Sequence, residues 1–148
     1  MEIVDTFTFL LGRWQVTRSI EDHLAGTRGW FAGVATIAEQ RCSEPENGSR
    51  AHYDEDGQLH FGVHTGAAQR HLEYRGRSDG SVALYFADGR AFVDLDLCAG
   101  EWQSTHLCGQ DEYTIVTVVR SSGLVEEHWQ VHGLAKRYEA TTTLTRIG

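Results

Sequence analysis

The chain has 148 residues, of which 41% are hydrophobic and 23% are charged, as is usual for soluble globular proteins. Its formal net charge is −8, and no stretch gathers Lys and Arg into a basic stripe. These features argue against a nucleic-acid partner, because phosphate backbones are bound by clustered positive charge.

The N-terminal stretch "MEIVDTFTFLLGRW" has acidic residues where a secretion signal needs positive charge, and its apolar run is short. No segment approaches the length of a membrane span, so we expect no membrane partner. The three cysteines, Cys42, Cys98 and Cys108, are an odd number without CxxC spacing and do not predict a disulfide framework. We therefore expect a reduced, cytoplasmic protein.

Residues 2 to 11 have a pattern that allows a short helix, and short strands follow it to the end of the chain. The strand segments are rich in Val, Ile, Thr, Tyr, Phe and Trp, and this spacing is typical of an antiparallel barrel or sandwich. No linker or repeat divides the chain, so residues 1–148 are predicted to form a single domain. Turns are expected at residues 24–29, 44–49, 54–57, 64–66, 78–80, 87–89, 98–100, 108–110, 121–123 and 132–135.

The first and last strands alternate in polarity. Both are long and amphipathic, so we expect them to pair and close a barrel, which removes the exposed edges of an open sheet. The predicted fold class is an all-β, closed antiparallel up-and-down barrel with a short N-terminal helix capping one end. The inward residues of the two strands are Trp14, Val16, Arg18 and Ile20, and Tyr138, Ala140, Thr142, Leu144 and Arg146.

A Gly-x-Trp at the first strand (Gly12, Trp14) and an arginine at the end of the last (Arg146) resemble the lipocalin and fatty-acid-binding (calycin) superfamily. Longer pieces, including "LLGRWQVTR", "FADGRAF", "HLCGQDEY" and "KRYEATTTLTR", resemble a bacterial family of uncharacterised lipocalin-like domains. That family carries a histidine after "FADGR-x-F", where this chain has Val93. The resemblance implies the barrel and an Arg146–Trp14 contact at its helix-covered end. It implies no particular activity.

Alternation also predicts which polar side chains point inside. Arg18 lies between inward Val16 and Ile20, and Arg70 shares a face with Leu72. The same pattern places Trp102, Ser104, His106 and Cys108 together, and Asp111 with Tyr113 and Ile115, whereas the direction of Tyr53 stays open. Arginine is rarely buried without a partner, so the inward arginines need an acid, such as Asp88 or Asp111, or an anion in a wet cavity.

Each of these residues also has a structural interpretation. His106 taken alone fits a hydrogen-bonded core histidine, and Cys108 fits a small buried apolar group. Arg90 fits the chemistry of the Asp-Gly turn as well as it fits a site. Tyr113 and Tyr138 fit rim aromatics with one wet end.

Taken together, they suggest the wall of a ligand cavity. His106 and Asp111 flank a short turn, and a histidine held by a carboxylate is a general base. Arginines would hold a substrate carboxylate, and a tyrosine would protonate an oxyanion. The predicted catalytic residues are His106, Asp111 and Tyr113, and the predicted substrate-binding residues are Arg18, Arg70, Asp88, Arg90, Tyr53 and Tyr138.

No metal or other cofactor is predicted. His60 and His64 in "HFGVH" are four apart, but the alternation around them favours a strand, where four residues span about 13 Å. That distance is too long for two ligands of one ion. His128 and His132 fail the same test.

Two functions remain open, and haem or metal binding is a third, less favoured one. The first is a cofactor-independent enzyme, an isomerase, cyclase or lyase, acting by acid–base chemistry on a hydrophobic substrate with a carboxylate or carbonyl group. The alternative is a non-catalytic carrier of a fatty-acid-like ligand. Both place a hydrophobic or acidic small molecule in the barrel cavity, and a homodimer is an open possibility in either case.

Overall fold

The computed structural model describes residues 2–40 and 48–148, and these contain one helix and ten strands. The expected turn at 44–49 and Cys42 lie mostly or wholly outside the described residues. No helix in the described part of the chain is long and apolar enough to cross a membrane. The elements are α1 (Thr6–Leu10), β1 (Gly12–Asp22), β2 (Thr27–Gln40), β3 (Arg50–Phe61), β4 (His64–Gly76), β5 (Val82–Phe86), β6 (Ala91–Leu95), β7 (Glu101–Cys108), β8 (Asp111–Ser121), β9 (Leu124–His132) and β10 (Arg137–Arg146).

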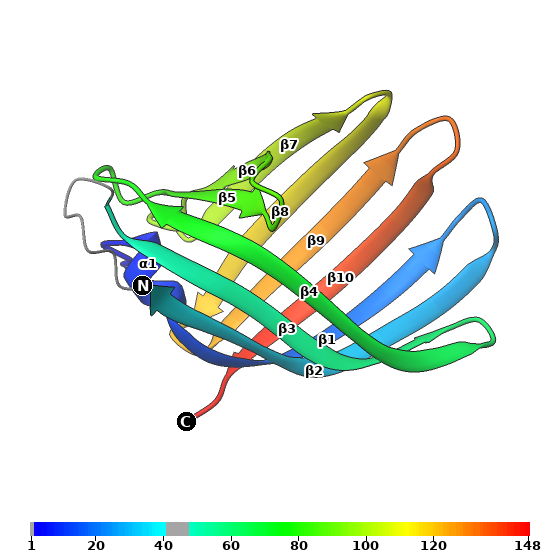
Figure 1. The fold of residues 1–148 in the computed structure, drawn as a ribbon, viewed down its shortest axis with the longest axis horizontal. Coiled ribbons are helices and arrows are strands. Elements are labelled where there is room, and N and C mark those ends of the chain that lie inside the picture. The colour runs from blue at the N-terminus through cyan, green and yellow to red at the C-terminus, as the bar shows by residue number, and fades with distance from the viewer. Residues whose placement is uncertain (1, 41–47) are drawn as a thin grey trace.

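All the strands belong to one antiparallel sheet in the order β6-β5-β4-β3-β2-β1-β10-β9-β8-β7. The sheet curls into a nearly closed barrel, so the predicted fold class is confirmed (Figure 1). The first strand pairs with the last from Trp14↔Arg146 to Asp22↔Tyr138, as their matching amphipathic patterns predicted. In Figure 1, the hairpin tips of β1–β2, β3–β4, β7–β8 and β9–β10 lie at the end of the barrel opposite α1.

Side chains bridge the seam between the two edge strands, β6 and β7. Ser104 Oγ donates to the backbone oxygen of Asp94 at 2.7 Å, and Trp102 Nε1 donates to the same oxygen at 2.9 Å. These bonds stand in for a backbone ladder, which joins β6 and β7 nowhere among the described residues. They occupy an edge acceptor that would otherwise be open to another strand.

The helix end of the barrel is filled by apolar side chains around Trp14. Asp5 caps α1 by accepting a hydrogen bond from the Thr8 amide, and Phe7 and Leu10 are buried beneath it. Trp14 is 0% exposed, and its Nε1 donates to the Leu10 backbone oxygen at 2.9 Å. One hydrogen bond thus satisfies the polar atom of a buried indole and anchors the helix to the barrel.

Arg146 closes this end, as the resemblance implied. Its guanidinium carbon lies 4.1 Å from the centre of the Trp14 ring, and Nη1 and Nη2 donate to the backbone oxygens of Leu11 and Phe9. Nε donates to the Ser122 oxygen in the β8–β9 turn. One arginine therefore joins the last strand, the segment after α1 and a hairpin turn.

Two of the predicted turns are wrong. Residues 54–57 and 64–66 lie inside β3 and β4, and the chain turns instead at Gly62 and Val63, where Gly62 has a φ of 60°. Gly57 does not bend the chain back but allows a close approach, because a Cβ there would lie 2.3 Å from the Ala32 oxygen on β2. The strand expected through His60 and His64 is therefore wrong as well: the two histidines lie on different strands of one hairpin.

We expect Arg146→Met to lower the free energy of unfolding by about 2–3 kcal/mol, because three backbone oxygens lose a charged donor while the apolar cover of Trp14 is largely kept. Urea unfolding measures the change. Arg120→Met is the control: Arg120 is an exposed arginine on β8 paired with Glu126, and its loss should cost about 0.5 kcal/mol or less. Equal effects from the two variants would contradict the role given to Arg146.

Candidate functional site

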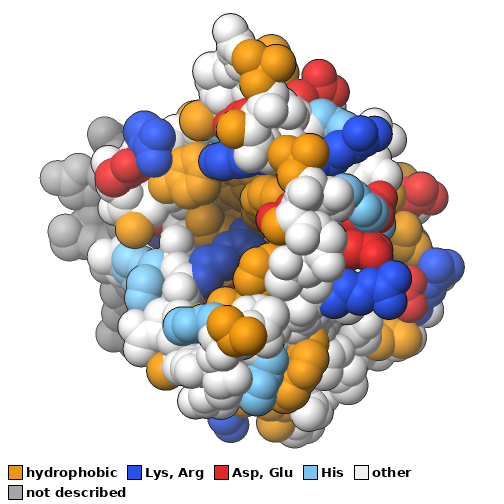
Figure 2. Space-filling model, turned by 90° about the vertical axis from the view of Figure 1, so that its right-hand side faces the viewer, with side chains coloured by type: hydrophobic (Ala, Val, Ile, Leu, Met, Phe, Trp, Pro, Cys, Tyr) orange, Lys and Arg blue, Asp and Glu red, His pale blue; other side chains and the backbone are white. Residues whose placement is uncertain are grey.

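A cavity of about 500 Å³ opens at the end of the barrel opposite α1, within the range of about 300–1,000 Å³ that small-molecule sites occupy. Figure 2 looks onto the open end, which is hollowed, with hydrophobic and basic side chains inside the hollow. The wall consists of Arg18, Ile20, Arg70, His71, Leu72, Phe86, Arg90, Phe92, His106, Cys108, Tyr113, Trp129, Tyr138 and Ala140.

The fold brings six of the nine predicted site residues onto this wall: Arg18, Arg70, Arg90, His106, Tyr113 and Tyr138. They come from strands far apart in the sequence, between β1 and β10, and from the β5–β6 turn. Tyr53 lies deeper in the barrel, and Asp88 and Asp111 do not line the cavity. The alternation along the strands therefore predicted the inward direction of five of these six side chains, all but Arg90, whereas the chemical roles of all six remain predictions.

Below the cavity lies a smaller void of about 40 Å³ that shares Arg18, Arg70 and Trp129 with it. Val93, at the position where the resembled family has a histidine, lines this void. Glu127 also lines it and accepts a hydrogen bond from Trp129 Nε1. The floor of the cavity is therefore partly polar.

A buried ion pair, Arg18–Glu55, forms the centre of that polar floor. Arg18 Nη1 and Nη2 donate to the two carboxylate oxygens of Glu55 at 2.9 and 2.8 Å, and Arg18 Nε donates to Thr142 Oγ1. The Tyr53 hydroxyl donates to Glu55 Oε1 at 2.5 Å. The prediction that Asp88 or Asp111 pairs with an inward arginine is thus wrong for Arg18, whose charge is neutralised by Glu55.

The two charges shift each other's pKa. Burial acts to raise the pKa of Glu55, but the hydrogen bonds and positive charge of Arg18 outweigh it and hold that pKa below its ordinary value of 4.5. Burial and the neighbouring Glu55 carboxylate raise the pKa of Tyr53 well above its usual 10. Tyr53 is therefore a neutral hydrogen-bond donor to Glu55. It does not line the 500 Å³ cavity in which a substrate was expected.

The sequence analysis missed Glu55, which is 2% exposed, because it assigned "DEDG" to a turn. The signal was present: continuing the alternation of "AHYDEDGQLHF" through residue 57 puts Ala51, Tyr53 and Glu55 on one face, and all three are buried. The same continuation would have settled the direction of Tyr53.

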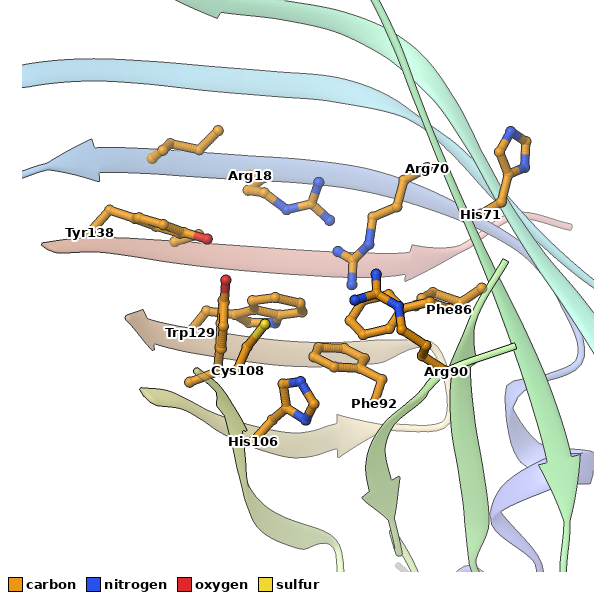
Figure 3. Close-up of a pocket in the computed structure, with 14 residues that line it drawn as sticks. Arg18, Arg70, His71, Phe86, Arg90, Phe92, His106, Cys108, Trp129 and Tyr138 are labelled. Carbon is orange, nitrogen blue, oxygen red and sulfur yellow. The ribbon is translucent and has the colours of Figure 1, made fainter. Parts of the chain in front are cut away.

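Arg70 points into the cavity and makes no ion pair or hydrogen bond with a carboxylate in the described part of the chain, although its charge helps to lower the pKa of Glu55. Its guanidinium carbon lies 4.6 Å from the centre of the Trp129 ring and 6.0 Å from that of Tyr53. Figure 3 shows Arg70 directed into the cavity from β4. An aromatic face stabilises a cation less than a carboxylate does, so Arg70 remains able to bind an anion.

His106 faces the cavity from β7 among aromatic rings. Its ring centre lies 5.4 Å from that of Phe92 and 6.0 Å from that of Phe86, edge to face, and 5.9 Å from that of Tyr113 (Figure 3). The ring does not point to bulk solvent away from the cavity, which keeps a role toward a ligand open.

The expected pair of His106 and Asp111 does not form, since no hydrogen bond joins them among the described residues. The reason is register: β7 and β8 place Tyr113 opposite His106, and Asp111 opposite Cys108, two residues nearer the hairpin turn. The Asp111 carboxylate instead lies 3.6 Å from Lys136 Nζ in the β9–β10 turn.

Tyr113 and Tyr138 stand together on the cavity wall near its mouth. Burial raises the pKa of Tyr138 and the neighbouring Tyr113 raises it further, so both the surroundings and the partner favour the neutral phenol. Tyr113, followed by Asp111, also raises the pKa of Lys136. The Tyr138 phenol is therefore available as a hydrogen-bond donor rather than as a base.

Asp88 and Arg90 satisfy each other in the β5–β6 turn. Asp88 Oδ1 accepts from the Arg90 amide and Oδ2 accepts from Arg90 Nε at 2.7 Å. Arg90 nevertheless lines the cavity, with its guanidinium carbon 5.2 Å from the Phe86 ring centre. The contacts of Asp88 are those of a turn residue, whereas Arg90 both stabilises the turn and lines the cavity.

Cys108 is exposed and lines the cavity near the end of β7, so its interpretation as a buried apolar group is wrong. The main omissions of the sequence analysis are apolar wall residues. Trp129 belongs to no quoted motif, and only its inward parity with Val125 and Val131 could have indicated it. Phe86 and Phe92 begin and end the family-like "FADGRAF", from which only Asp88 and Arg90 were predicted as site residues.

Within the described residues, three side chains on the outer face could share one metal ion: Glu21, His23 and Glu139. They are not cavity residues. The cavity wall contains three side chains of the kinds that bind zinc: His71 on β4, and His106 and Cys108 two positions apart on β7. The predicted lack of a cofactor stays a prediction.

Residues 10–146 match the model of a family of unknown function, DUF6314. The chain belongs to this family. This confirms the prediction that the chain belongs to an uncharacterised family. The comparison with curated proteins gave no match.

Three solved structures were found to be similar to this chain. The S-type phycobiliprotein lyase CPES from Guillardia theta aligns with a TM-score of 0.62 and 12% identity, over 100% of this chain and 94% of the lyase. A de novo designed fluorescence-activating β-barrel aligns at 0.48 and 14%, over 98% and 100%. A protein of unknown function of the DUF3598 family from Nostoc punctiforme aligns at 0.46 and 10%, over 97% of this chain and 50% of its own. The likeness to the lyase supports the fold alone.

We expect Glu55→Gln to lower the free energy of unfolding at pH 7 by about 3 kcal/mol, because it leaves the Arg18 charge buried without a counter-ion. The folded-state pKa of Glu55 is below 4.5, so the pair contributes fully above that pH and its contribution is lost as pH falls through the lowered pKa. Urea unfolding across this range should show the gap between wild type and variant narrowing in acid. Glu126→Gln, at an exposed pair, is the control, and a gap that stays constant down to pH 3 would count against this account.

Proposed function

We propose that the chain binds a hydrophobic small molecule with an acid group inside the barrel. The single observation that carries the proposal is Arg70, a cation in the cavity that has no acidic partner in residues 2–40 and 48–148. Arg18 is neutralised by Glu55, and Arg90 is shared with Asp88. An anionic ligand would give Arg70 the charged acceptor that the protein does not supply, in a setting where such bonds are strong.

The rest of the wall favours a flat or elongated apolar body. Phe86 and Phe92 have ring centres 4.6 Å apart, and those of Phe92 and Trp129 are 5.4 Å apart. Ile20, Leu72 and Ala140 add aliphatic surface. Aromatic side chains pack well against planar or chain-like ligands, and burial of about 25 cal/mol per Å² of apolar surface drives such binding.

We also infer that this barrel belongs with the lipocalin and fatty-acid-binding superfamily. The pairing of the first strand with the last and the packing of Arg146 over Trp14 support that inference. The lyase shares the fold at low identity, so its activity is not transferred to this chain. A cytoplasmic location remains a prediction, as does a single domain over residues 1–148.

The proposal is tested with two dyes that differ by one charge, anilinonaphthalene sulfonate and the uncharged N-phenylnaphthylamine. Both fluoresce in apolar sites. We expect Arg70→Met to weaken binding of the sulfonate about 10–100-fold, the loss of a charge-assisted hydrogen bond of about 1.5–3 kcal/mol. Binding of the uncharged dye should change little, because the apolar wall is intact.

Arg120→Met, on the outside of β8, is the matched control and should leave both dyes unaffected. If Arg70→Met weakens both dyes equally, the variant has damaged the cavity and a Gln variant replaces it. Sulfonate binding that survives both Arg70 substitutions would overturn the proposal.

A second candidate function, the cofactor-independent isomerase, cyclase or lyase, is favoured by the position of His106. The His106 imidazole faces the cavity beside Tyr113, its partner on the neighbouring strand β8. A potential base and a potential proton donor therefore lie on the same wall. General acid–base catalysis of this kind contributes about 10²–10⁴ in rate. Against it stands the missing carboxylate partner of His106 in the described structure.

His106→Ala separates the two functions. Protein purified from cells should retain any tightly bound molecule, which mass spectrometry of the extracted ligand identifies. If the chain only binds, we expect wild type and His106→Ala to carry the same molecule, because Arg70 and the apolar wall are unchanged. Different molecules, substrate in the variant and product in the wild type, would favour the enzyme.

A further inference from the structure

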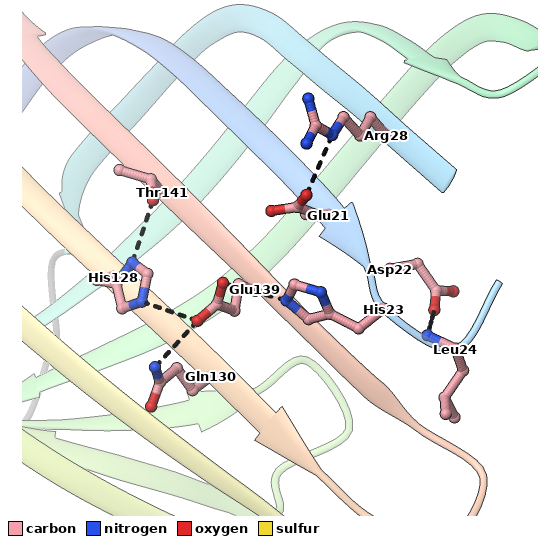
Figure 4. Close-up of polar contacts among 9 residues, drawn as sticks. All are labelled: Glu21, Asp22, His23, Leu24, Arg28, His128, Gln130, Glu139 and Thr141. Carbon is pink, nitrogen blue, oxygen red and sulfur yellow. Dashed lines mark hydrogen bonds and ion pairs between the residues drawn. The ribbon is translucent and has the colours of Figure 1, made fainter. Parts of the chain in front are cut away.

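A cluster of His and Glu side chains lies on the outer face of the barrel, where β1, β10 and β9 run side by side. Glu21, His23 and Glu139 each offer one ligand atom, and these atoms all lie within 4.8 Å of one another. Figure 4 shows Glu139 lying between His23 and His128. The proposed function uses none of these residues, which are on the opposite face of the strands from the cavity wall.

The distances are close to those of a metal site. His23 Nε2 lies 3.2 Å from Glu139 Oε2. With Zn–N near 2.0 Å and Zn–O near 2.1 Å, neighbouring ligand atoms of a tetrahedral zinc site are about 3.4 Å apart. Because all three side chains are partly exposed, small rotations are enough to bring the Glu21 carboxylate to the same distance.

The other oxygen of Glu139 is held by a second set of side chains. Gln130 Nε2 donates to Glu139 Oε1 at 3.0 Å, and His128 Nε2 lies 3.8 Å from the same oxygen. Thr141 Oγ1 lies 3.1 Å from His128 Nδ1 and fixes the direction of that ring. Supports of this kind orient a ligating carboxylate, leaving Oε2 directed toward His23.

The pairing of the strands gives an independent reason to expect a cation. Glu21 and Glu139 are directly opposite each other across β1 and β10, and like charges in that relation destabilise a sheet. Arg28 reaches Glu21 at 3.1 Å, but its side chain is 84% exposed and is easily displaced. A divalent ion would neutralise both carboxylates at once.

We propose that Glu21, His23 and Glu139 form a binding site for a divalent transition metal of the zinc type, with water in the fourth position. The mixed nitrogen and oxygen donor set suits zinc better than calcium or magnesium, which take oxygen ligands. The ion joins the end of β1 and the residue that follows it, His23, to β10, the strand paired with β1. Because such a site exists only in the folded chain, zinc raises the melting temperature.

The test uses protein without a histidine tag, stripped with a chelator and titrated with zinc chloride in a calorimeter. We expect one zinc per chain, and His23→Gln and Glu139→Gln each to weaken binding by about ten-fold or more. Gln130→Leu should weaken it by a smaller factor than either ligand variant, since it removes only a supporting bond. Arg28→Met should strengthen it, because a competing cation is gone.

His52→Gln, at an exposed histidine on β3 outside the cluster, is the matched control and should bind zinc as wild type does. Cobalt gives a second readout, because a four-coordinate site produces strong visible absorption. Failure of the wild type to bind zinc, or binding that His23→Gln and His52→Gln change equally, overturns the proposal. Neither outcome affects the proposed ligand site, which is tested at Arg70.

Discussion

The Arg18–Glu55 ion pair is the constraint on which the interior of this barrel depends. Two charges in the middle of a sheet cannot be covered by apolar residues alone, and each needs its remaining hydrogen-bonding atoms satisfied. Thr142 and Tyr53 supply those bonds. The packed helix end lies on one side of this network and the open cavity on the other, with Arg18 bordering both the cavity and the void below it.

The Arg18–Glu55 ion pair also determines which arginine in the cavity has its charge available for the proposed ligand. With Arg18 neutralised from below, the positive charge directed into the cavity belongs to Arg70, which is supported by the face of Trp129. The helix end has no comparable freedom, since Arg146 donates to three backbone oxygens there. Three inward arginines thus have three different roles: structural pair, candidate anchor and closing contact.

The outer face follows a different principle. Alternation along β10 sends Tyr138 toward the cavity and Glu139 outward, so the chemistry of adjacent residues is separated by the full thickness of the sheet. Two histidines four residues apart on one strand, such as His128 and His132 on β9, are about 13 Å apart and cannot share one ion. Side chains directly opposite each other on neighbouring strands, such as Glu21 and Glu139, are much closer than that. The cluster of Glu21, His23 and Glu139 forms between such strands.

How much could be predicted follows from the range over which each signal acts. The alternation within β1 and β10 and the Gly-x-Trp with its terminal arginine determined the barrel, the helix end and the inward direction of Arg18, Arg70 and His106, because facing is a local property of a strand. The partners of those side chains were not determined. Register between strands placed Tyr113 rather than Asp111 opposite His106, and the curl of the sheet brought Glu55 to Arg18, because contacts across a barrel depend on the whole closed structure and not on any one segment of the chain.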